Sequence, residues 1–338
     1  MGQNGPMDEF QFLPAQARDI DSDRVPPVRR LSFDLPDGRS VSGLHYGDPV
    51  SGAFTPPVVT FLHGAGLNAH TWDTTVIALG LPALALDLPG HGDSSWRDDA
   101  AYTGRHLAQD IAEVVAAWTH GPQVLVGQSL GGLTAAALAA SRPDLVRELV
   151  IVDISPGIDP NGGASQIAAF FAGPTDWATR DELVERAVEF GLGGTREAAT
   201  RGVFLNSRIR PDGRVEWKHH FAHLAAAMAE DPLAAQSARQ GQDALRGVLA
   251  ASGWEDLATV RAPLTLVYGE RGFLTAQDVA DYRTKNAEAT IIAVASGHNV
   301  QEEAPRELAA IVAAIAGADS GKNRGSASVD DGGCTPHP

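Results

Sequence analysis

The segment QVLVGQSLGGL, residues 123–133, constrains the fold of this chain more than any other stretch. It runs as a short apolar strand, turns at a single serine and continues as an alanine-rich helical sequence. A strand that reverses into a helix within so few residues forces Ser129 into a strained backbone conformation with its side chain projecting outward. Gly127 and Gly131 relieve the crowding on either side. The spacing G-x-S-x-G therefore predicts a strand-turn-helix unit that presents one serine hydroxyl.

Apolar strand-like runs alternate with helix-like runs on both sides of this segment. Strands are expected in RRLSFDL, SVSGLHYG, PPVVTFLHG, LPALALDLPG, QVLVGQ, ELVIVDISPG, APLTLVYGE and ATIIAVAS, and helices at about 104–118, from Leu130, near 276–285 and from Glu302. Apolar strands separated by helices are typical of a parallel sheet that is covered on both faces. We therefore predict the α/β class, with a mostly parallel, doubly wound sheet.

The expected domain organisation is one core interrupted by an insertion. Residues 158–252 break the alternation with helix-like segments such as DELVERAVEFGL and HHFAHLAAAMAED. This predicts a helical cap inserted into a core made of residues 29–157 and 253–317, lying over the strand ends where open α/β sheets bind ligands. The polar residues 1–28 and the Gly-, Ser- and Asp-rich residues 318–338 are predicted to be disordered tails.

The charge balance excludes several classes of partner. The chain has 26 Lys and Arg against 42 Asp and Glu, a net charge of −16, which argues against nucleic acid or an anionic membrane as a partner. No apolar run is long enough to span a bilayer, and the N-terminus lacks the features of a secretory signal. The single cysteine, Cys334, cannot form an internal disulfide, so we expect a cytoplasmic protein. The sequence does not indicate an oligomeric state.

A serine hydroxyl needs a base to take its proton and a third group to orient that base. His298 follows the last predicted strand in the glycine-preceded loop ASGHNVQEEAPREL and is the candidate base. Charge that develops on a carbonyl oxygen would be stabilised by two backbone N–H groups. We expect these groups at Leu130, directly after the serine, and at Ala65 in the loop FLHGAGLNAHTWD, with Gly66 as the alternative to Ala65.

Six motifs together resemble the α/β-hydrolase superfamily in its capped, esterase-like branch. They are LHGAG, LDLPGHGDSS, GQSLGG, VDISPG, RAPLTLVYGE and SGHNVQEEAP, in family order and near family spacing between about Leu31 and Gly317. The resemblance implies that G-x-S-x-G is a nucleophile elbow. It also implies acyl transfer, in which Ser129 attacks a carbonyl, an acyl-enzyme forms, and water activated by His298 releases it. No metal and no organic cofactor are expected.

The triad acid departs from the family pattern. In most members it follows the strand that here reads PLTLVYGE, three residues after the glycine, and that position is Gly272. Asp153 ends the strand after the serine helix, where some members place the acid, and a carboxylate flanked by apolar residues favours a paired role. Glu270, on the usual loop but out of register, and a site without a carboxylate are the alternatives.

Other polar features are interpreted as structural. His63 is expected to brace its loop through hydrogen bonds, and Asp87 to hold the loop before the cleft. His219 and His223 stand four apart, a spacing that suits metal ligation, but no H-E-x-x-H motif is present and a solvated helical face is expected. The cap aromatics are expected to form the cap core, with some lining an apolar acyl or ring pocket: Phe170, Phe171, Trp177, Phe204, Trp217 and Phe221.

These residues favour hydrolysis of a small apolar carboxylic ester or lactone. Dehalogenases and epoxide hydrolases of similar fold need aspartate where this chain has Ser129. Carbon–carbon hydrolases of ring-cleavage products are a nearer alternative, although Gln128 and Asn299 replace the asparagine and the aromatic residue typical of that group. A non-hydrolytic lyase or cyclase, or a small-molecule-binding protein, is the alternative from another class, motivated by the displaced acid. The natural substrate is not readable, because specificity lies in the cap.

Overall fold

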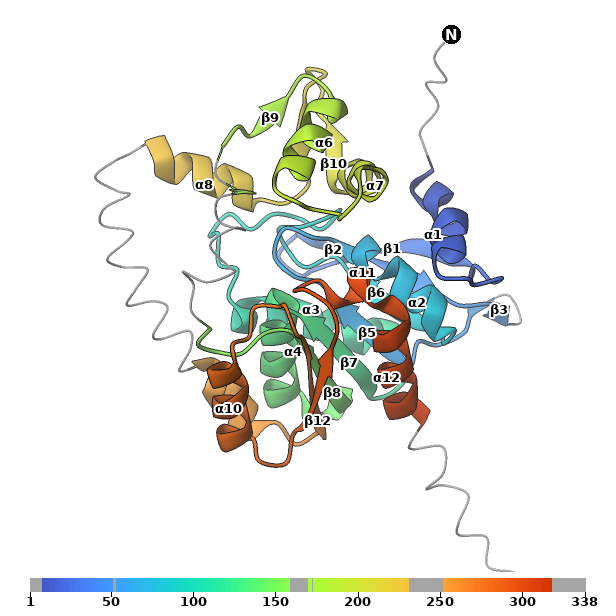
Figure 1. The fold of residues 1–338 in the computed structure, drawn as a ribbon, viewed down its shortest axis with the longest axis vertical. Helices are drawn as coiled ribbons and strands as arrows, with labels where there is room; N and C mark the ends of the chain where they lie inside the picture. The colour runs from blue at the N-terminus through green and yellow to red at the C-terminus, as the bar shows by residue number, and fades with distance from the viewer. Residues whose placement is uncertain (1–7, 51–52, 159–169, 172, 231–251, 318–338) are drawn as a thin grey trace, which may run out of the picture.

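A central sheet of eight strands organises the molecule (Figure 1). The computed structural model describes residues 8–50, 53–158, 170–171, 173–230 and 252–317. In spatial order the strands are β1 (Val28–Asp34), β2 (Ser40–Tyr46), β6 (Ala83–Leu86), β5 (Val59–Leu62), β7 (Gln123–Gln128), β8 (Val146–Val152), β12 (Leu264–Gly269) and β13 (Thr290–Val294). The first two pairings are antiparallel and every later one is parallel. The predicted mostly parallel sheet is confirmed.

Helices cover both faces of this sheet (Figure 1). On β6, Leu84 and Leu86 pack into one core cluster while Ala83 and Ala85 pack into the other, because successive side chains of a strand point to opposite faces. This two-sided burial explains why the strands read as continuous apolar runs. One face carries α3 (Gly104–Trp118), α4 (Leu130–Ser141) and α10 (Ala276–Lys285), and the other carries α2 (Asp73–Leu79) and α12 (Pro305–Gly317).

The expected helix from Glu302 is two helices instead of one. The first is α11 (Val300–Glu303), and α12 begins directly after Ala304. Pro305 has no N–H to donate and disfavours helical geometry at the residue before it, so the chain breaks there and starts again. The remaining short core elements are η2 (Ala69–Trp72), η3 (Pro143–Leu145), β3 (Pro49–Val50), β4 (Ala53–Phe54) and a helix at residues 252–259.

The prediction that residues 1–28 form a disordered tail is wrong for residues 8–28. This segment forms η1 (Glu9–Phe12) and α1 (Leu13–Asp19), and then leads into β1. Leu13, Ala17 and Ile20 are buried against Ile77 of α2, so the segment has its own apolar contact with the core. Figure 1 shows α1 beside α2. The composition of this segment is polar overall, so it did not indicate that α1 buries one apolar face. Residues 1–7 and the predicted tail at 318–338 lie outside the described residues.

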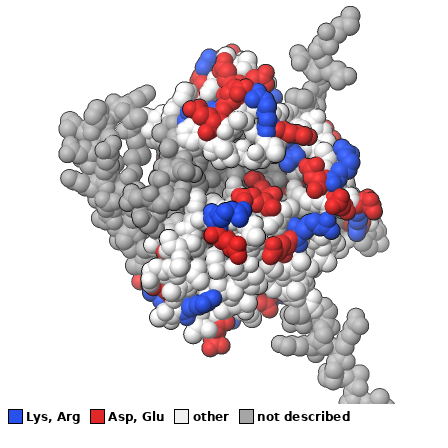
Figure 2. Space-filling model, viewed as in Figure 1, with Lys and Arg blue, Asp and Glu red and all other residues white. Residues whose placement is uncertain are grey.

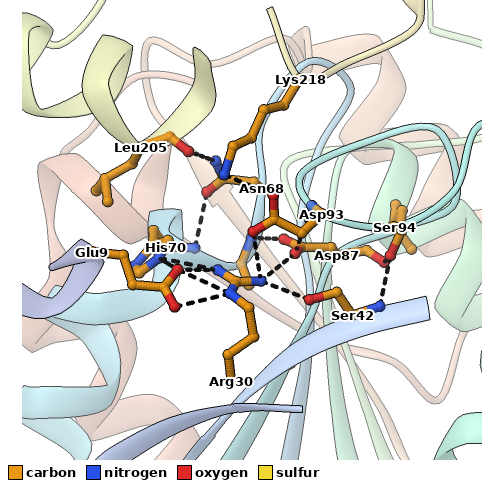
Figure 3. A network of polar contacts seen from close by, with 12 residues as sticks. Glu9, Arg30, Ser42, Asn68, His70, Asp87, Asp93, Ser94, Leu205 and Lys218 are labelled. Atoms are coloured by element: carbon orange, nitrogen blue, oxygen red, sulfur yellow. Dashed lines mark hydrogen bonds and ion pairs between the residues drawn. The ribbon is translucent and has the colours of Figure 1, made fainter. Parts of the chain in front are cut away.

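A charged network ties the N-terminal segment to the core (Figure 3). Glu9 binds the guanidinium of Arg30 at 2.6 Å and lies 3.2 Å from Nε2 of His70. Burial disfavours a charged carboxylate, but hydrogen bonds from His70 and Arg30 outweigh it and lower the pKa of Glu9 to about 2. Burial also opposes charge on His70, yet the charge and hydrogen bond of Asp73 and the bond to Glu9 raise its pKa to about 9.

Glu9→Gln is expected to lower Tm by about 3 to 8 °C near pH 7, because it removes one carboxylate from this cluster. The raised pKa of His70 contributes stability that is complete below its ordinary value of 6.5 and is lost as pH rises through about 9. The difference between the variant and the natural chain should therefore shrink above pH 9. Thermal unfolding from pH 6 to 10 measures this. Glu288→Gln, at an exposed position, is the matched control, and an equal loss there would contradict the role of Glu9.

The described residues of the expected helical cap form a mixed layer of helices and short strands. Three helices pack against a small antiparallel sheet of order β10-β11-β9, and a core of Trp177, Leu183, Val203 and Trp217 holds them together. The strands form because a turn at Gly213 lets two short segments pair. The elements are β9 (Asp176–Trp177), α6 (Arg180–Glu189), α7 (Arg196–Asn206), β10 (Ser207–Ile209), β11 (Val215–Trp217) and α8 (Phe221–Glu230). Residues 159–169, 172 and 231–251 of the expected cap lie outside the described residues.

Charges of both signs are distributed over the surface. On the face shown in Figure 2, Lys and Arg are interspersed with Asp and Glu, and the described residues form no continuous basic patch there. In the described part of the chain, every helix is too short or too polar to cross a membrane.

Candidate active site

Five adjacent parallel strands deliver the predicted site residues to one edge of the sheet. β5 leads into the loop of Ala65, β7 into Ser129, and β8 into Asp153. β12 leads into the loop of Gly272, and β13 into His298. Because these strands are parallel neighbours, their carboxyl ends lie side by side at the edge where open α/β sheets bind ligands. Chain segments far apart in sequence therefore converge at one site.

Ser129 occupies the predicted strained turn between β7 and α4. Its φ is +52°, in a region that side chains with a Cβ rarely adopt. A Cβ at Gly127 would lie 2.2 Å from the carbonyl oxygen of Gly131, and a Cβ at Gly131 would lie 2.3 Å from that of Leu62. Glycine is therefore required at both positions by close backbone approach. The predicted strand-turn-helix unit is confirmed.

One expected N–H donor, Leu130, directly follows the serine, and the other, Ala65, lines the same cavity. Leu130 is the first residue of α4, so its N–H has no acceptor within the helix. Neither N–H has a hydrogen-bond partner among the described residues. Gly66, the alternative donor, has its carbonyl oxygen held at 2.6 Å by the side-chain amide of Asn206 from the cap.

Asp153 and His298 are directly bonded. Oδ2 of Asp153 lies 2.7 Å from Nδ1 of His298. The carboxylate is fully buried and also accepts the backbone N–H groups of Gly269 at 2.9 Å and Phe273 at 2.8 Å. These three donors compensate the loss of water around the charge. The imidazole is 12% exposed and faces the cavity that Ser129 lines.

A side chain has no room at Gly272, the position where the resemblance predicts the acid. A Cβ at position 272 would lie 2.3 Å from Oδ1 of Asp153. The carboxylate that arrives from β8 therefore fills the space that a side chain from the β12 loop would take. Glu270, the alternative acid, is exposed, and its backbone N–H bonds to the carbonyl of Val294 on β13.

Two residues that the sequence reasoning did not assign to the site contact His298. The ring of Phe273 stacks on the imidazole with centroids 3.5 Å apart and planes at 8°. The side-chain nitrogen of Gln128 lies 3.0 Å from Nε2 of His298. The position of Gln128 could have been suspected from the sequence, since it directly precedes the serine in the motif. Phe273 could not, because its contact with His298 depends on how the loop after β12 lies against the loop after β13.

His63 and Asp87 are structural, as expected. Both ring nitrogens of His63 are occupied, by the carbonyl of Gly64 at 2.8 Å and the N–H of Leu88 at 2.9 Å, and burial lowers its pKa. Burial disfavours the charge of Asp87, but the charge of Arg30 overcomes this and lowers the pKa of the carboxyl. Asp87 accepts the N–H of Ala69 at 2.7 Å and so holds the loop below the cap (Figure 3).

The expectation that His219 lies on a solvated helical face is wrong. His219 precedes α8 and is fully buried, with its ring stacked on Trp217 at 17°. Burial lowers its pKa to about 3, so the ring is neutral. His223 is partly buried and lies 3.4 Å from Glu216. Within the described residues, no group of three or more His, Cys, Asp or Glu side chains is arranged to hold a metal ion.

A cavity of about 370 Å³ separates the cap from the site. Aromatic rings of the cap line part of its wall, and the expectation that some cap aromatics line a pocket is confirmed for Phe170, Phe171 and Trp217. Trp177 belongs to the cap core instead. Polar side chains form another part of the wall: Gln16 of the N-terminal segment, Asn68 and Thr71 of the core, and Arg201 of the cap helix α7.

Comparison with known proteins agrees with this architecture. The sequence pattern of the family described as "Alpha/beta hydrolase family" matches residues 61–311, so the chain belongs to that family. Esterase Rv0045c of Mycobacterium tuberculosis is 34% identical over 319 residues, covering 91% of this chain and 96% of the relative. A solved structure of that esterase covers 92% of this chain and 99% of its own, at 32% identity and a TM-score of 0.74. Within the family, the chain is a carboxylic ester hydrolase.

A more distant relative is the sn-1-specific diacylglycerol lipase ABHD11 of Mus musculus. It is 32% identical over 186 residues, which cover 52% of this chain and 59% of the relative.

Proposed function

We propose that ester hydrolysis proceeds through a Ser129–His298–Asp153 triad and an acyl-enzyme. The bond from Asp153 to His298, beside the cavity that Ser129 lines, carries this proposal. Nε2 of His298 takes the proton as Oγ of Ser129 attacks the carbonyl carbon, and returns it to the departing alkoxide. Water then repeats the sequence on the acyl-enzyme and releases the acid. Asp153 keeps the second ring proton on Nδ1 and stabilises the imidazolium.

The negative oxygen of each tetrahedral intermediate binds the N–H groups of Leu130 and Ala65. Leu130 directly follows Ser129, Ala65 lines the same cavity, and neither N–H has a protein partner among the described residues, which leaves both free to bind the oxyanion. The N-terminal end of α4 adds a favourable dipole for the same charge.

The proposed substrate is a small ester with an apolar acyl group, and a lactone is the cyclic variant of the same bond. The cavity lies near the lower end of the 300–1,000 Å³ that ligand pockets usually span, and aromatic cap residues line it. The hydrogen bond between buried Asp153 and His298 supports a hydrolytic site over a non-hydrolytic scaffold, which had been considered because the usual acid position is Gly272.

A serine-directed fluorophosphonate and p-nitrophenyl butyrate together test the mechanism. We expect the probe to label one residue, Ser129 by peptide mapping, and to stop turnover in proportion to labelling. Turnover that survives complete labelling of Ser129, or labelling of another residue, would refute the triad. A parallel series of lactones of increasing ring size decides between open-chain and cyclic esters.

Phe171→Ala is expected to widen the cavity toward longer acyl chains. Phe171 packs over Gly66, where a Cβ would come within 2.6 Å of its ring. In the natural chain, kcat/KM for p-nitrophenyl acetate and butyrate should exceed that for the decanoate by about tenfold. The variant should reduce this ratio at least threefold, because the wider cavity buries more of the long acyl chain and each buried methylene is worth roughly 0.8 kcal/mol. Ile209→Ala, which is 60% exposed on the cap, is the control. An unchanged chain-length preference would place the acyl group elsewhere.

A further inference from the structure

Gln128 is the last residue of β7, and its side chain is fully buried directly before Ser129. Its Nε2 lies 3.0 Å from Nε2 of His298, 3.3 Å from the His298 carbonyl oxygen and 3.4 Å from Oδ1 of Asn299. A backbone carbonyl can only accept a hydrogen bond, so the amide nitrogen, and not the amide oxygen, faces His298. Gln128 therefore donates an N–H to the imidazole.

This donation fixes the state of the ring. Nδ1 of His298 donates its proton to Asp153, and Nε2, which accepts from Gln128, carries a lone pair and no proton. This is the neutral tautomer that a general base requires. The same in-plane lone pair must take the proton of Ser129. Among the described residues, Asp153 and Gln128 are the partners of the two ring nitrogens, so the lone pair is occupied before substrate arrives.

The oxygen of the Gln128 amide provides a second observation, independent of the contacts of its nitrogen. Oε1 of Gln128 is buried without a hydrogen-bond partner among the described residues. It points at Gly64, where a Cβ would come within 2.2 Å of it. An unpaired buried acceptor destabilises a protein, and a methionine of similar length would avoid that cost. A function of the amide N–H at the site explains why a glutamine stands here.

We propose that Gln128 is a positioning residue that sets the resting state of His298. Its N–H selects the tautomer with a proton-free Nε2 and occupies that lone pair until substrate draws the ring toward Ser129. Two opposite effects follow from this single bond. The bond stabilises the neutral ring, so it lowers the pH at which the base becomes active. It must also break before proton transfer, so it slows acylation once the base is active. The proposal rests on the catalytic roles proposed above.

The test compares the pH dependence of fluorophosphonate labelling in the natural chain and in two full-length variants. The labelling rate is expected to rise with pH and then level off. In Gln128→Met, the midpoint, which is the pH at which this rate is half-maximal, should rise by about 0.5 to 1 pH unit, while the maximal rate should increase roughly two- to fivefold. Gln128→Glu, whose carboxylate accepts a proton from Nε2, should raise the midpoint further. Gln123→Met, at another buried glutamine of β7, is the matched control and should change neither value.

The charged groups near His298 stay constant in these variants. Asp153 binds its ring, Glu302 lines the same cavity, Glu303 accepts the N–H of Gly297 at 2.7 Å, and Arg271 lies 4.0 Å from Glu303. A shift in midpoint therefore reports the amide and not a new charge, except in Gln128→Glu, where the new carboxylate is intended. An unchanged midpoint in a folded Gln128→Met would overturn the proposal.

A second measurement does not depend on the Gln128 variants folding. The ¹⁵N signal of Nε2 in His298 should report a hydrogen-bonded acceptor in the natural chain and in Ser129→Ala alike, since Gln128 and not Ser129 is the donor. A signal that shifts to that of an unbonded nitrogen in Ser129→Ala would overturn the proposal. If the natural chain fails to label at Ser129, the triad fails, and this signal still decides the role of Gln128.

Discussion

Ser129→Ala is expected to lower kcat for p-nitrophenyl butyrate by roughly 10⁴-fold or more and to abolish fluorophosphonate labelling. The reason is that Ser129 supplies the hydroxyl at this turn, where the backbone has a φ of +52° and the residue lines the cavity. Loss of the nucleophile removes the covalent pathway altogether. Residual activity would come from the N–H donors of Ala65 and Leu130 and from substrate binding, so it should not reach zero.

The fold should survive this change, because the Ser129 side chain makes no hydrogen bond among the described residues. Thermal unfolding should therefore show Tm within about 2 °C of the natural chain. Ser141→Ala provides a matched control at the other end of α4, the helix that begins directly after Ser129, and the Ser141 hydroxyl donates to the carbonyl of Ala137 at 2.7 Å. Activity in Ser129→Ala comparable with that of Ser141→Ala would end the triad assignment.

Asp153→Asn should lower kcat by about 10³- to 10⁴-fold. An asparagine cannot keep the proton on Nδ1 of His298 or stabilise the imidazolium, and it presents only one oxygen where the carboxylate accepts from His298, Gly269 and Phe273. Some loss of stability is therefore expected as well, and Tm must be measured beside kcat. Glu270→Gln, at the exposed alternative acid, should stay within twofold of the natural chain. The reverse pattern would assign the acid to Glu270.

An exchange of positions separates the catalytic role of the carboxylate from its role in folding. Asp153→Gly removes the acid and accommodates the positive φ of +48° at that residue. Adding Gly272→Asp aims a carboxylate from the β12 loop at the emptied space, since a Cβ there lies 2.3 Å from the present Oδ1. We expect the kcat of the double variant to be at least tenfold higher than that of Asp153→Gly alone. Gly272→Asp alone should destabilise the chain, because two carboxylates cannot share that volume.

Local sequence patterns predicted most of the fold. The period and length of apolar runs located the strands, and α3 and α10 have the bounds expected for them. The elbow was predictable because its constraints act within a few residues: a strand, two glycines and a helix. The N-terminal segment was misread, since its buried stripe of Leu13, Ala17 and Ile20 matters only through its contact with α2. The cap strands were missed for a similar reason, as segments of two or three residues carry no periodic signal.

The sequence by itself determined the serine at the turn, the histidine after the last strand and the class of sheet that carries them. Only the tertiary structure placed Asp153, and not Glu270, against Nδ1 of His298, because that contact depends on which carboxylate reaches the ring across neighbouring strands. The contacts of Phe273 and Gln128 with the imidazole have the same origin. Residues distant in sequence meet through the order of strands in the sheet, and strand order is set by packing, which no local pattern encodes.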